Sequence, residues 1–275
     1  MLRVWGEQLI PDRPIPIFIL QGSVNRYVWA KQFTKGGVIL DVACGSGYGS
    51  NYLKEKGAKE IVGGDLSRDA VAYAASRYKG GKIHFVRLSA DSLPFASCSF
   101  DSVVSFETIE HLEKYEGFAF ECERILKDRG QFVCSTPNRA ASLSDKGKPL
   151  AHYHFKEFSI TEFRRLLERY FSQVRLYGMD PQGKGNKILY LIAARFQYLV
   201  FSVPHLHRLI NFFTKFFFVR YHLVKLSECS SDTFDRIVDE KYRPYPLECK
   251  SLIPGDIIGI SIKGLNIDIT TERLC

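Results

Sequence analysis

Residues 105–111, with the sequence SFETIEH, place two carboxylates and an imidazole within five positions. If this segment turned into a helix, Glu107, Glu110 and His111 would share one face, because residues three and four apart are neighbours on a helix. Such a set can bind a divalent metal ion, or it can act as general acid and base. A third interpretation makes Glu110 and His111 a hydrogen-bonded pair at a helix start, with no catalytic duty.

A glycine-rich segment, VILDVACGSGYGS, follows the first apolar run and contains Gly45, Gly47 and Gly49. Glycines let the backbone turn tightly and let a ligand approach the main chain. The spacing is GxGxG, whereas a dinucleotide site favours GxGxxG. The carboxylate of Asp41 would repel a pyrophosphate, but it suits a ligand that carries an ammonium and a sulfonium. The segment therefore disfavours an NAD-dependent oxidoreductase.

Two more aspartates follow the next two apolar runs. Asp65 ends the second run, where a carboxylate can accept hydrogen bonds from both ribose hydroxyls. Asp91 follows the third run, in SADSLPF, and is placed to meet an adenine amino group. Each aspartate alone is typical of a turn or a helix cap. With Asp41, three aspartates follow three successive runs in order, which turns alone do not readily explain.

The elements that would position these residues alternate between apolar runs and helical patterns, which predicts an α/β fold with a mostly parallel sheet. Strands are expected at residues 36–45, 60–67, 82–90, 100–107, 130–138, 172–180 and 255–264. Helices are expected at residues 48–57, 68–80, 117–130 and 159–171. Ser159 precedes Glu162 by three positions, which is the spacing of a capping box.

A single domain is expected over residues 1–275, because no Gly/Ser or Pro tract divides the chain. It would comprise an N-terminal helical cap (1–35), a core (36–181), an aromatic and basic helical insertion (182–254) and a final strand (255–264).

The series DVACGSG, VGGDLS, SADSLPF, SFETIEHLE and STPN resembles the class I S-adenosylmethionine-dependent methyltransferases, over residues 20–180. The resemblance implies a Rossmann-like, seven-stranded and mostly parallel sheet with an antiparallel last strand, helices on both faces, and S-adenosylmethionine as cofactor. It implies that the methionyl part is held by Asp41, Ala43, Gly45 and Gly47, the ribose by Asp65, and the adenine by Leu66, Asp91 and Ser92, while Phe106 lines the pocket. Ala43 departs from the family's usual glycine, and its methyl group could narrow the fit at the methionine end.

Upstream, NRYVWA is similar to the family's N-terminal helix. The similarity implies that Arg26 pairs with the cofactor carboxylate and that Tyr27 covers the cofactor. The alternative leaves Arg26 as an ordinary surface charge.

The ExxEH pattern is similar to that of two metal-dependent branches, the ubiquinone-pathway O-methyltransferases and the small-RNA 3′-end 2′-O-methyltransferases. It implies that Glu107, Glu110 and His111 hold a divalent ion, commonly Mg²⁺, and that His154 matches a second histidine of the RNA branch. Mn²⁺ or Fe²⁺ is also reasonable, because histidine suits softer metals. Without a metal, His111 could serve as a general base, and His152 and His154 could be surface residues.

The net charge of +8 is uneven, since residues 146–225 hold 14 Lys/Arg and 4 Asp/Glu, a net +10 that leaves −2 for the remainder. This stretch indicates either an anionic partner or a solvated positive face. Its aromatic segment 211–224 is expected to be a buried helix, or else an interfacial helix in peripheral contact with a membrane. The resemblance makes residues 182–254 a lid or specificity element.

Seven cysteines, odd in number and without a CxxC pair, and the lack of a signal peptide predict a reduced, cytoplasmic protein. No window is long and apolar enough to span a bilayer. We expect O-methylation of a small-molecule, sugar or lipid-linked hydroxyl. The alternatives are 2′-O-methylation of an RNA 3′ end and, from another class, a non-catalytic binding subunit that retains the cofactor fold.

Overall fold

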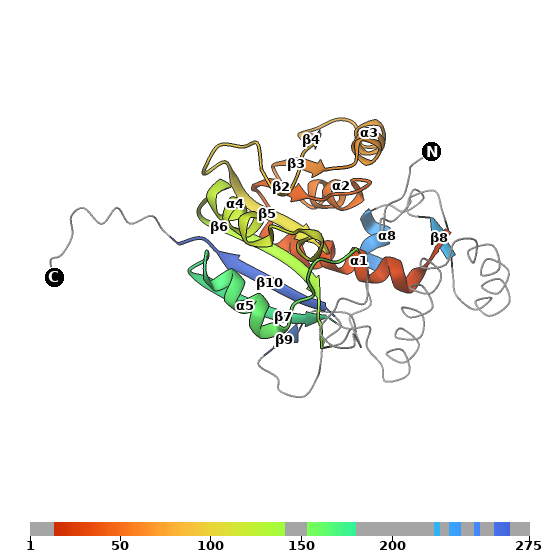
Figure 1. Ribbon diagram of the computed structural model, residues 1–275. Helices are drawn as coiled ribbons and strands as arrows, with labels where there is room; N and C mark the ends of the chain where they lie inside the picture. Colours follow the sequence, from red (N-terminus) through yellow and green to blue (C-terminus); the bar gives the residue numbers. More distant parts are fainter. Residues whose placement is uncertain are drawn as a thin grey trace.

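The computed structural model describes residues 14–140, 153–179, 223–225, 231–237, 245–247 and 256–264. They form an eight-stranded sheet of order β4-β3-β2-β5-β6-β10-β7-β9 (Figure 1). Its strands are β2 (Val38–Val42), β3 (Glu60–Asp65), β4 (Ile83–Arg87), β5 (Phe100–Phe106), β6 (Leu126–Pro137), β7 (Gln173–Met179), β9 (Tyr245–Pro246) and β10 (Asp256–Ile262). The pairings from β4 to β6 are parallel, whereas β10 runs antiparallel to both β6 and β7.

This sheet confirms the predicted seven strands and the antiparallel last strand. The two-residue strand β9 extends the sheet beyond β7 and was not predicted. A separate antiparallel pair joins β1 (Pro14–Pro16) to β8 (Leu223–Lys225). The segment β8 lies within the predicted insertion, so this part of the insertion lies beside the N-terminal region.

Helices precede or follow the strands largely where the sequence predicts them. They are α1 (Ile17–Ala30), α2 (Tyr48–Glu55), α3 (Arg68–Arg77), α4 (Tyr115–Ile125), α5 (Ile160–Glu168) and α8 (Ser231–Ile237), with the short 3-10 helices η1 (Lys31–Phe33) and η2 (Ile109–His111). The capping box of Ser159 and Glu162 at α5 is confirmed. The helix predicted at 117–130 ends earlier, because Leu126 is buried in extended conformation and begins β6.

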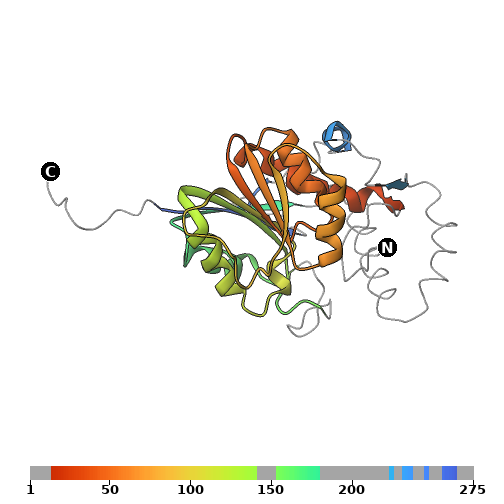
Figure 2. The ribbon, with the colours of Figure 1, turned by 90° about the horizontal axis from the view of Figure 1, so that it is seen from above.

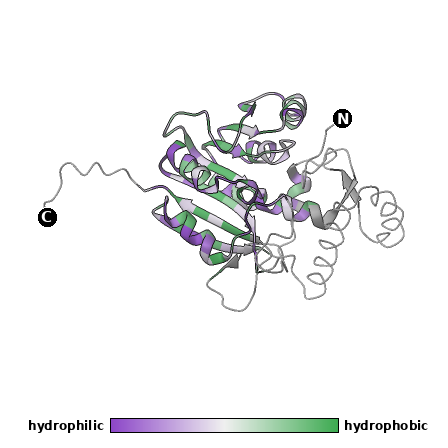
Figure 3. Ribbon diagram, viewed as in Figure 1, coloured by the Kyte–Doolittle hydropathy of each residue, from purple (hydrophilic) through white to green (hydrophobic). Residues whose placement is uncertain are grey.

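The hydrophobic core is divided between the two faces of the sheet, because successive strand residues point to opposite sides. On one face, Leu40 and Val103 pack in a cluster with residues of α4 and α5. On the other face, Ile39 and Val104 pack in a cluster with residues of α1 and α2. Figure 2 shows the layers from above, and Figure 3 shows that hydrophobic residues follow the central strands. Helices on both faces are therefore confirmed.

The parallel strands β2, β3, β4 and β5 end at one edge of the sheet. The chain proceeds from β2 outward to β4 and then returns to the other side of β2 as β5. In open α/β sheets, ligands bind at such a reversal of strand order. The predicted cofactor and substrate residues follow these strand ends.

Most of the predicted insertion at 182–254 lies outside the described residues, including the aromatic stretch 211–222, as does His152. The division into a cap, a core, an insertion and a final strand stays a prediction. Within the part of the chain that the structure describes, no helix has the length and apolar character needed to cross a bilayer.

Candidate functional site

The loop after β2 adopts left-handed backbone at three positions. Gly45 has φ +55°, Gly47 has φ +79° and Ala43 has φ +60°. A Cβ on Gly47 would lie 2.7 Å from Ala74 and from the ring of Phe85, so this position needs glycine. A Cβ on Gly45 would meet nothing within 4 Å, so the main chain there faces open space. Ala43 holds a conformation that an L-residue adopts at a cost of about 1 kcal/mol.

Asp65, at the end of β3, fixes this loop. Its carboxylate accepts hydrogen bonds from the backbone N–H of Gly45 and of Ser67, each at 2.8 Å. Burial raises the pKa of Asp65, and the two N–H donors oppose that effect. Each carboxylate oxygen has a second lone pair, so Asp65 can still accept bonds from a ligand hydroxyl.

The predicted adenine residues lie at the surface near this strand end. Leu66 is 64% exposed, unusually so for a large apolar side chain. Asp91 and Ser92 are also exposed, and both contact Ser89. The N–H of Leu88 donates to the backbone oxygen of Asp65, which joins the start of the 88–92 segment to the end of β3.

Asp41 lies deeper than a surface ligand group would. Its side chain is fully buried and accepts hydrogen bonds from the hydroxyls of Ser50 at 2.6 Å and Tyr27 at 3.2 Å. Burial raises the pKa of Asp41 to about 7, although the bonds from Ser50 and Tyr27 lower it. The aspartate that the sequence predicts to meet the cofactor therefore binds α1 and α2 in this structure.

The residues of α1 meet the end of β5 as well. Arg26 pairs with Glu107 at 3.2 Å from Nη2 to Oε2. The ring of Tyr27 lies edge-on to Phe106, with centroids 4.9 Å apart. Arg26 is 7% exposed, so the interpretation as an ordinary surface charge is wrong.

Residues 105–111 do not form the α-helix that would align Glu107 with Glu110 and His111. Strand β5 continues to Phe106, Glu107 has φ +50°, and only Ile109–His111 form a 3-10 turn. The left-handed backbone at Glu107 directs its carboxylate to Arg26 and Ser135. The surroundings of Glu107 therefore differ from those of Glu110 and His111.

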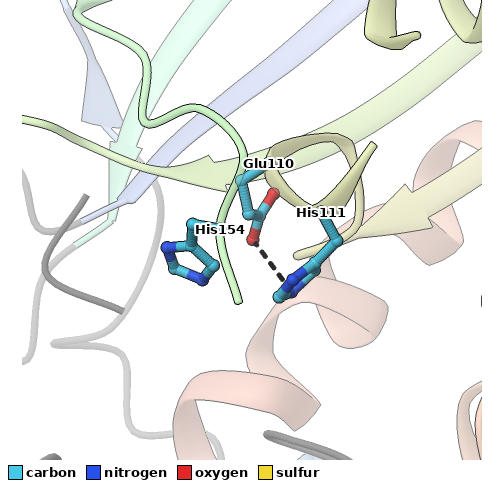
Figure 4. Close-up of side chains that lie close together, drawn as sticks. All are labelled: Glu110, His111 and His154. Atoms are coloured by element: carbon cyan, nitrogen blue, oxygen red, sulfur yellow. Dashed lines mark ion pairs between the residues drawn. The ribbon is translucent and has the colours of Figure 1, made fainter. Parts of the chain in front are cut away.

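Glu110, His111 and His154 gather instead as one group, with potential ligand atoms all within 4.8 Å of one another. Figure 4 shows that Glu110 and His111 come from one turn, whereas His154 comes from a separate segment. Oε1 of Glu110 lies 3.9 Å from Nε2 of His111. Glu110 is fully buried, and the hydroxyl of Thr136 donates to its Oε2 at 3.1 Å.

A contact at Nδ1 orients each of the two imidazoles. Nδ1 of His111 lies 3.2 Å from the backbone oxygen of Tyr153, and Nδ1 of His154 lies 3.2 Å from Oε1 of Glu157. Because both oxygens can only accept, Nδ1 is the donor in each case, and Nε2 carries the lone pair of a neutral ring. Nε2 of His154 is buried and has no hydrogen-bond partner among the described residues.

Sequence reasoning missed four residues that bind the predicted site residues, namely Ser50, Ser135, Thr136 and Glu157. The first three donate through hydroxyls to Asp41, Glu107 and Glu110, at separations of 9, 28 and 26 positions. Glu157 follows His154 by three positions, and this spacing was the one available signal.

Comparisons with known proteins agree with this fold. Residues 40–134 match the family model described as a methyltransferase domain. A probable S-adenosylmethionine-dependent methyltransferase from Mycolicibacterium smegmatis is 35% identical over 167 residues, which cover 61% of this chain and 64% of that protein. A ubiquinone biosynthesis O-methyltransferase from Roseobacter denitrificans is 30% identical over 122 residues, which cover 44% of this chain and 49% of that protein. The matches thus span less than two thirds of these relatives.

A solved structure from Thermotoga maritima, a SAM-dependent methyltransferase described as a possible histamine N-methyltransferase, has a TM-score of 0.55. The likeness covers 89% of this chain and 90% of that chain at 15% identity, so it supports the fold alone. Residues 40–134 therefore match the methyltransferase domain family, and the sheet has the Rossmann-like order of class I S-adenosylmethionine-dependent methyltransferases.

Proposed function

We propose that the chain transfers a methyl group from S-adenosylmethionine to a hydroxyl oxygen of a small molecule or sugar. One observation carries the proposal: Asp65 holds the glycine loop through Gly45, which faces open space, and the exposed Leu66 follows directly. This offers a carboxylate for a ribose and an apolar side chain for an adenine. The similarity to the Roseobacter relative, an O-methyltransferase, supports oxygen as the acceptor atom.

The residues of the chain would share the work at the edge of the sheet. Asp65 would orient the ribose, Leu66, Asp91 and Ser92 would flank the adenine, and Arg26 would meet the carboxylate of the methionyl part. When bound, the cofactor supplies a methyl group that is activated by its sulfonium. The chain's main contribution is then to align the acceptor oxygen with that methyl group.

We further propose Glu110, His111 and His154 as ligands of a divalent ion. The donors fit such a group, because two oriented Nε2 atoms and a buried carboxylate oxygen lie within 4.8 Å of one another. A set with two imidazoles favours Mn²⁺ or Fe²⁺ over Mg²⁺. When bound, the ion would lower the pKa of an acceptor hydroxyl. The alternative without an ion uses Nε2 of His111 as the general base.

Calorimetric titration of S-adenosylhomocysteine tests the cofactor site. We expect binding to the wild type and a large loss of affinity in Asp65→Asn. The amide has one uncharged acceptor oxygen, whereas the carboxylate can accept charge-assisted hydrogen bonds from both ribose hydroxyls. The exposed Asp128 provides the matched control, and Asp128→Asn should bind normally. Unchanged affinity in Asp65→Asn would refute the role given to this residue.

Elemental analysis after loading with Mn²⁺ or Mg²⁺ and dialysis tests the ion site. We expect one ion per chain in the wild type and in His84→Ala, whose imidazole is exposed, but none in His154→Ala. Equal ion content in both variants would leave His111 as a base.

Methyl transfer from labelled cofactor to catechols, sugars and RNA 3′ ends would identify the acceptor, and transfer to RNA alone would overturn the small-molecule proposal.

A further inference from the structure

We propose that Glu107 is a positioning residue that holds Arg26 for the cofactor carboxylate, and that it does not ligate an ion. The inference rests on the function proposed above. The ExxEH pattern groups Glu107 with Glu110 and His111. The contacts that Glu107 makes in the structure instead associate it with the cofactor end of the site.

Both carboxylate oxygens of Glu107 have partners of their own. Oε2 lies 3.2 Å from Nη2 of Arg26, and Oε1 accepts a hydrogen bond from the hydroxyl of Ser135 at 2.6 Å. The side chains of Arg26 and Glu107 are only 9% and 18% exposed, and Ser135 is fully buried. An ion pair that is largely removed from water is weakly screened, so its geometry is well determined.

The backbone of Glu107 is held in an unfavourable conformation for this contact. Its φ is +50°, in the left-handed region that disfavours a side chain. The N–H of Glu107 lies 3.2 Å from both the backbone oxygen and the hydroxyl of Ser135 on β6. Such conformations persist where the surroundings determine them, and they cluster at functional sites. Here the result is a carboxylate directed to Arg26.

Helix α1 brings Arg26 to the methionyl end of the proposed cofactor site. The neighbouring Tyr27 bonds Asp41, and its ring covers Gly49 so closely that a Cβ there would collide with it. The charge of Arg26 also lowers the pKa of Tyr48, the first residue of α2, against the larger opposing effect of burial. Because the adjacent Tyr27 packs against Gly49, Arg26 lies on the part of α1 that is beside the start of α2.

The same contacts argue against Glu107 as an ion ligand. A guanidinium at 3.2 Å repels a cation at that carboxylate, whereas the group of Glu110, His111 and His154 assembles without Glu107. Arginine has five N–H donors in a planar fork, enough to serve Glu107 and a second carboxylate together. Glu107 would thus hold the side chain of Arg26 in place before the cofactor arrives, which reduces the entropy lost on binding.

The test compares two ligands that differ at the methionyl end. S-adenosylhomocysteine carries the amino-acid carboxylate, and 5′-methylthioadenosine lacks it. We expect Glu107→Gly to weaken S-adenosylhomocysteine by about tenfold to a hundredfold and to leave 5′-methylthioadenosine unchanged. Glycine tolerates the left-handed backbone, which offsets part of the stability lost with the ion pair, so the unfolding of each variant is measured beside its ligand affinity. Glu107→Gln should show a smaller loss, and the exposed Glu113 provides the control Glu113→Gln.

Arg26→Ala should produce the same ligand-selective loss, and the double variant with Glu107→Gly should add little to it, because one interaction is removed twice. Equal losses for both ligands would mean a merely structural role and would overturn the proposal. Loss of a bound ion with unchanged S-adenosylhomocysteine affinity would overturn it in favour of a ligand role. A wild-type protein that binds neither ligand would instead refute the proposed function itself.

Discussion

Asp41 gives the protein a pH-dependent stability that one substitution should remove. The carboxyl group is fully buried between Tyr27 and Ser50, and burial raises its pKa to about 7. Asn has the same shape, can accept the bond from Ser50 and can donate to the oxygen of Tyr27, but it never ionises. Asp41→Asn therefore removes the titration and keeps the packing.

The sign follows from the direction of the pKa change. Because the folded pKa lies above the unfolded value near 3.8, the folded state retains a proton that the unfolded state has lost. The contribution of Asp41 to stability is full below pH 3.8 and declines as the pH rises to about 7. Between pH 5 and pH 8 the wild type should lose about 2.6 kcal/mol relative to Asp41→Asn, at 1.36 kcal/mol per pH unit.

Urea unfolding of both proteins without cofactor, at pH 5, 6, 7 and 8, measures this difference. The free energy of unfolding of Asp41→Asn minus that of the wild type should rise by the stated amount and level off above pH 7. Asp128→Asn, at an exposed position, should show no such trend. A difference that is constant from pH 5 to pH 8 would refute the reasoning, since it would mean that Asp41 does not change its protonation in the folded state.

Three further predictions use the same methods. Tyr27→Phe removes a hydrogen bond that lowers the pKa of Asp41, so the pH above which the free energy of unfolding stops changing relative to Asp41→Asn should rise above 7. An unchanged pH would mean that the bond from Tyr27 does not lower this pKa. Ala43→Gly should raise the free energy of unfolding by about 1 kcal/mol, because φ is +60° there, and a lower value would contradict the strain. Partial burial would raise the pKa of Asp235, but bonds from Lys56, Lys31 and Tyr52 lower it to about 2, so its contribution to stability is present above pH 4 and lost as the pH falls toward 2. Asp235→Asn should therefore be less stable than the wild type at pH 7, and this difference in the free energy of unfolding should be about halved at pH 3 and small near pH 2. An undiminished difference at pH 2 would refute this ion pair.

The features that the sequence predicts well are those set by local pattern. Strand β2 follows from an apolar run with a glycine turn, and the cap of α5 follows from Ser159 and Glu162 three positions apart. The antiparallel direction of the last strand was predicted from the family resemblance, because the residues of that strand do not indicate its direction. The end of α4 was misjudged, since ILKDRG has no strong helix breaker before Gly130, and strand pairing of Leu126 with Phe100 prevails over helix propensity.

The membership of the candidate ion group, Glu110, His111 and His154, is harder to predict from the sequence. Helical spacing suggested that Glu107 would join Glu110 and His111, and no local rule indicates that Glu107 takes a left-handed backbone. Its conformation depends on Ser135, 28 positions further along the chain. The alignment of His154 was available only through resemblance, and the role of Glu157 in orienting it is a tertiary contact.

Two adjacent residues of α1 reach carboxylates at the ends of two adjacent strands, Arg26 to Glu107 after β5 and Tyr27 to Asp41 in β2. These strands are paired where the strand order reverses, with Asp41 opposite Val104. A helix can make both contacts only if it crosses this edge of the sheet, so α1 forms one wall of the proposed site. Binding of a ligand with both an ammonium and a carboxylate would therefore act on both contacts of α1 together, and the two variants Asp41→Asn and Glu107→Gly should affect its affinity non-additively.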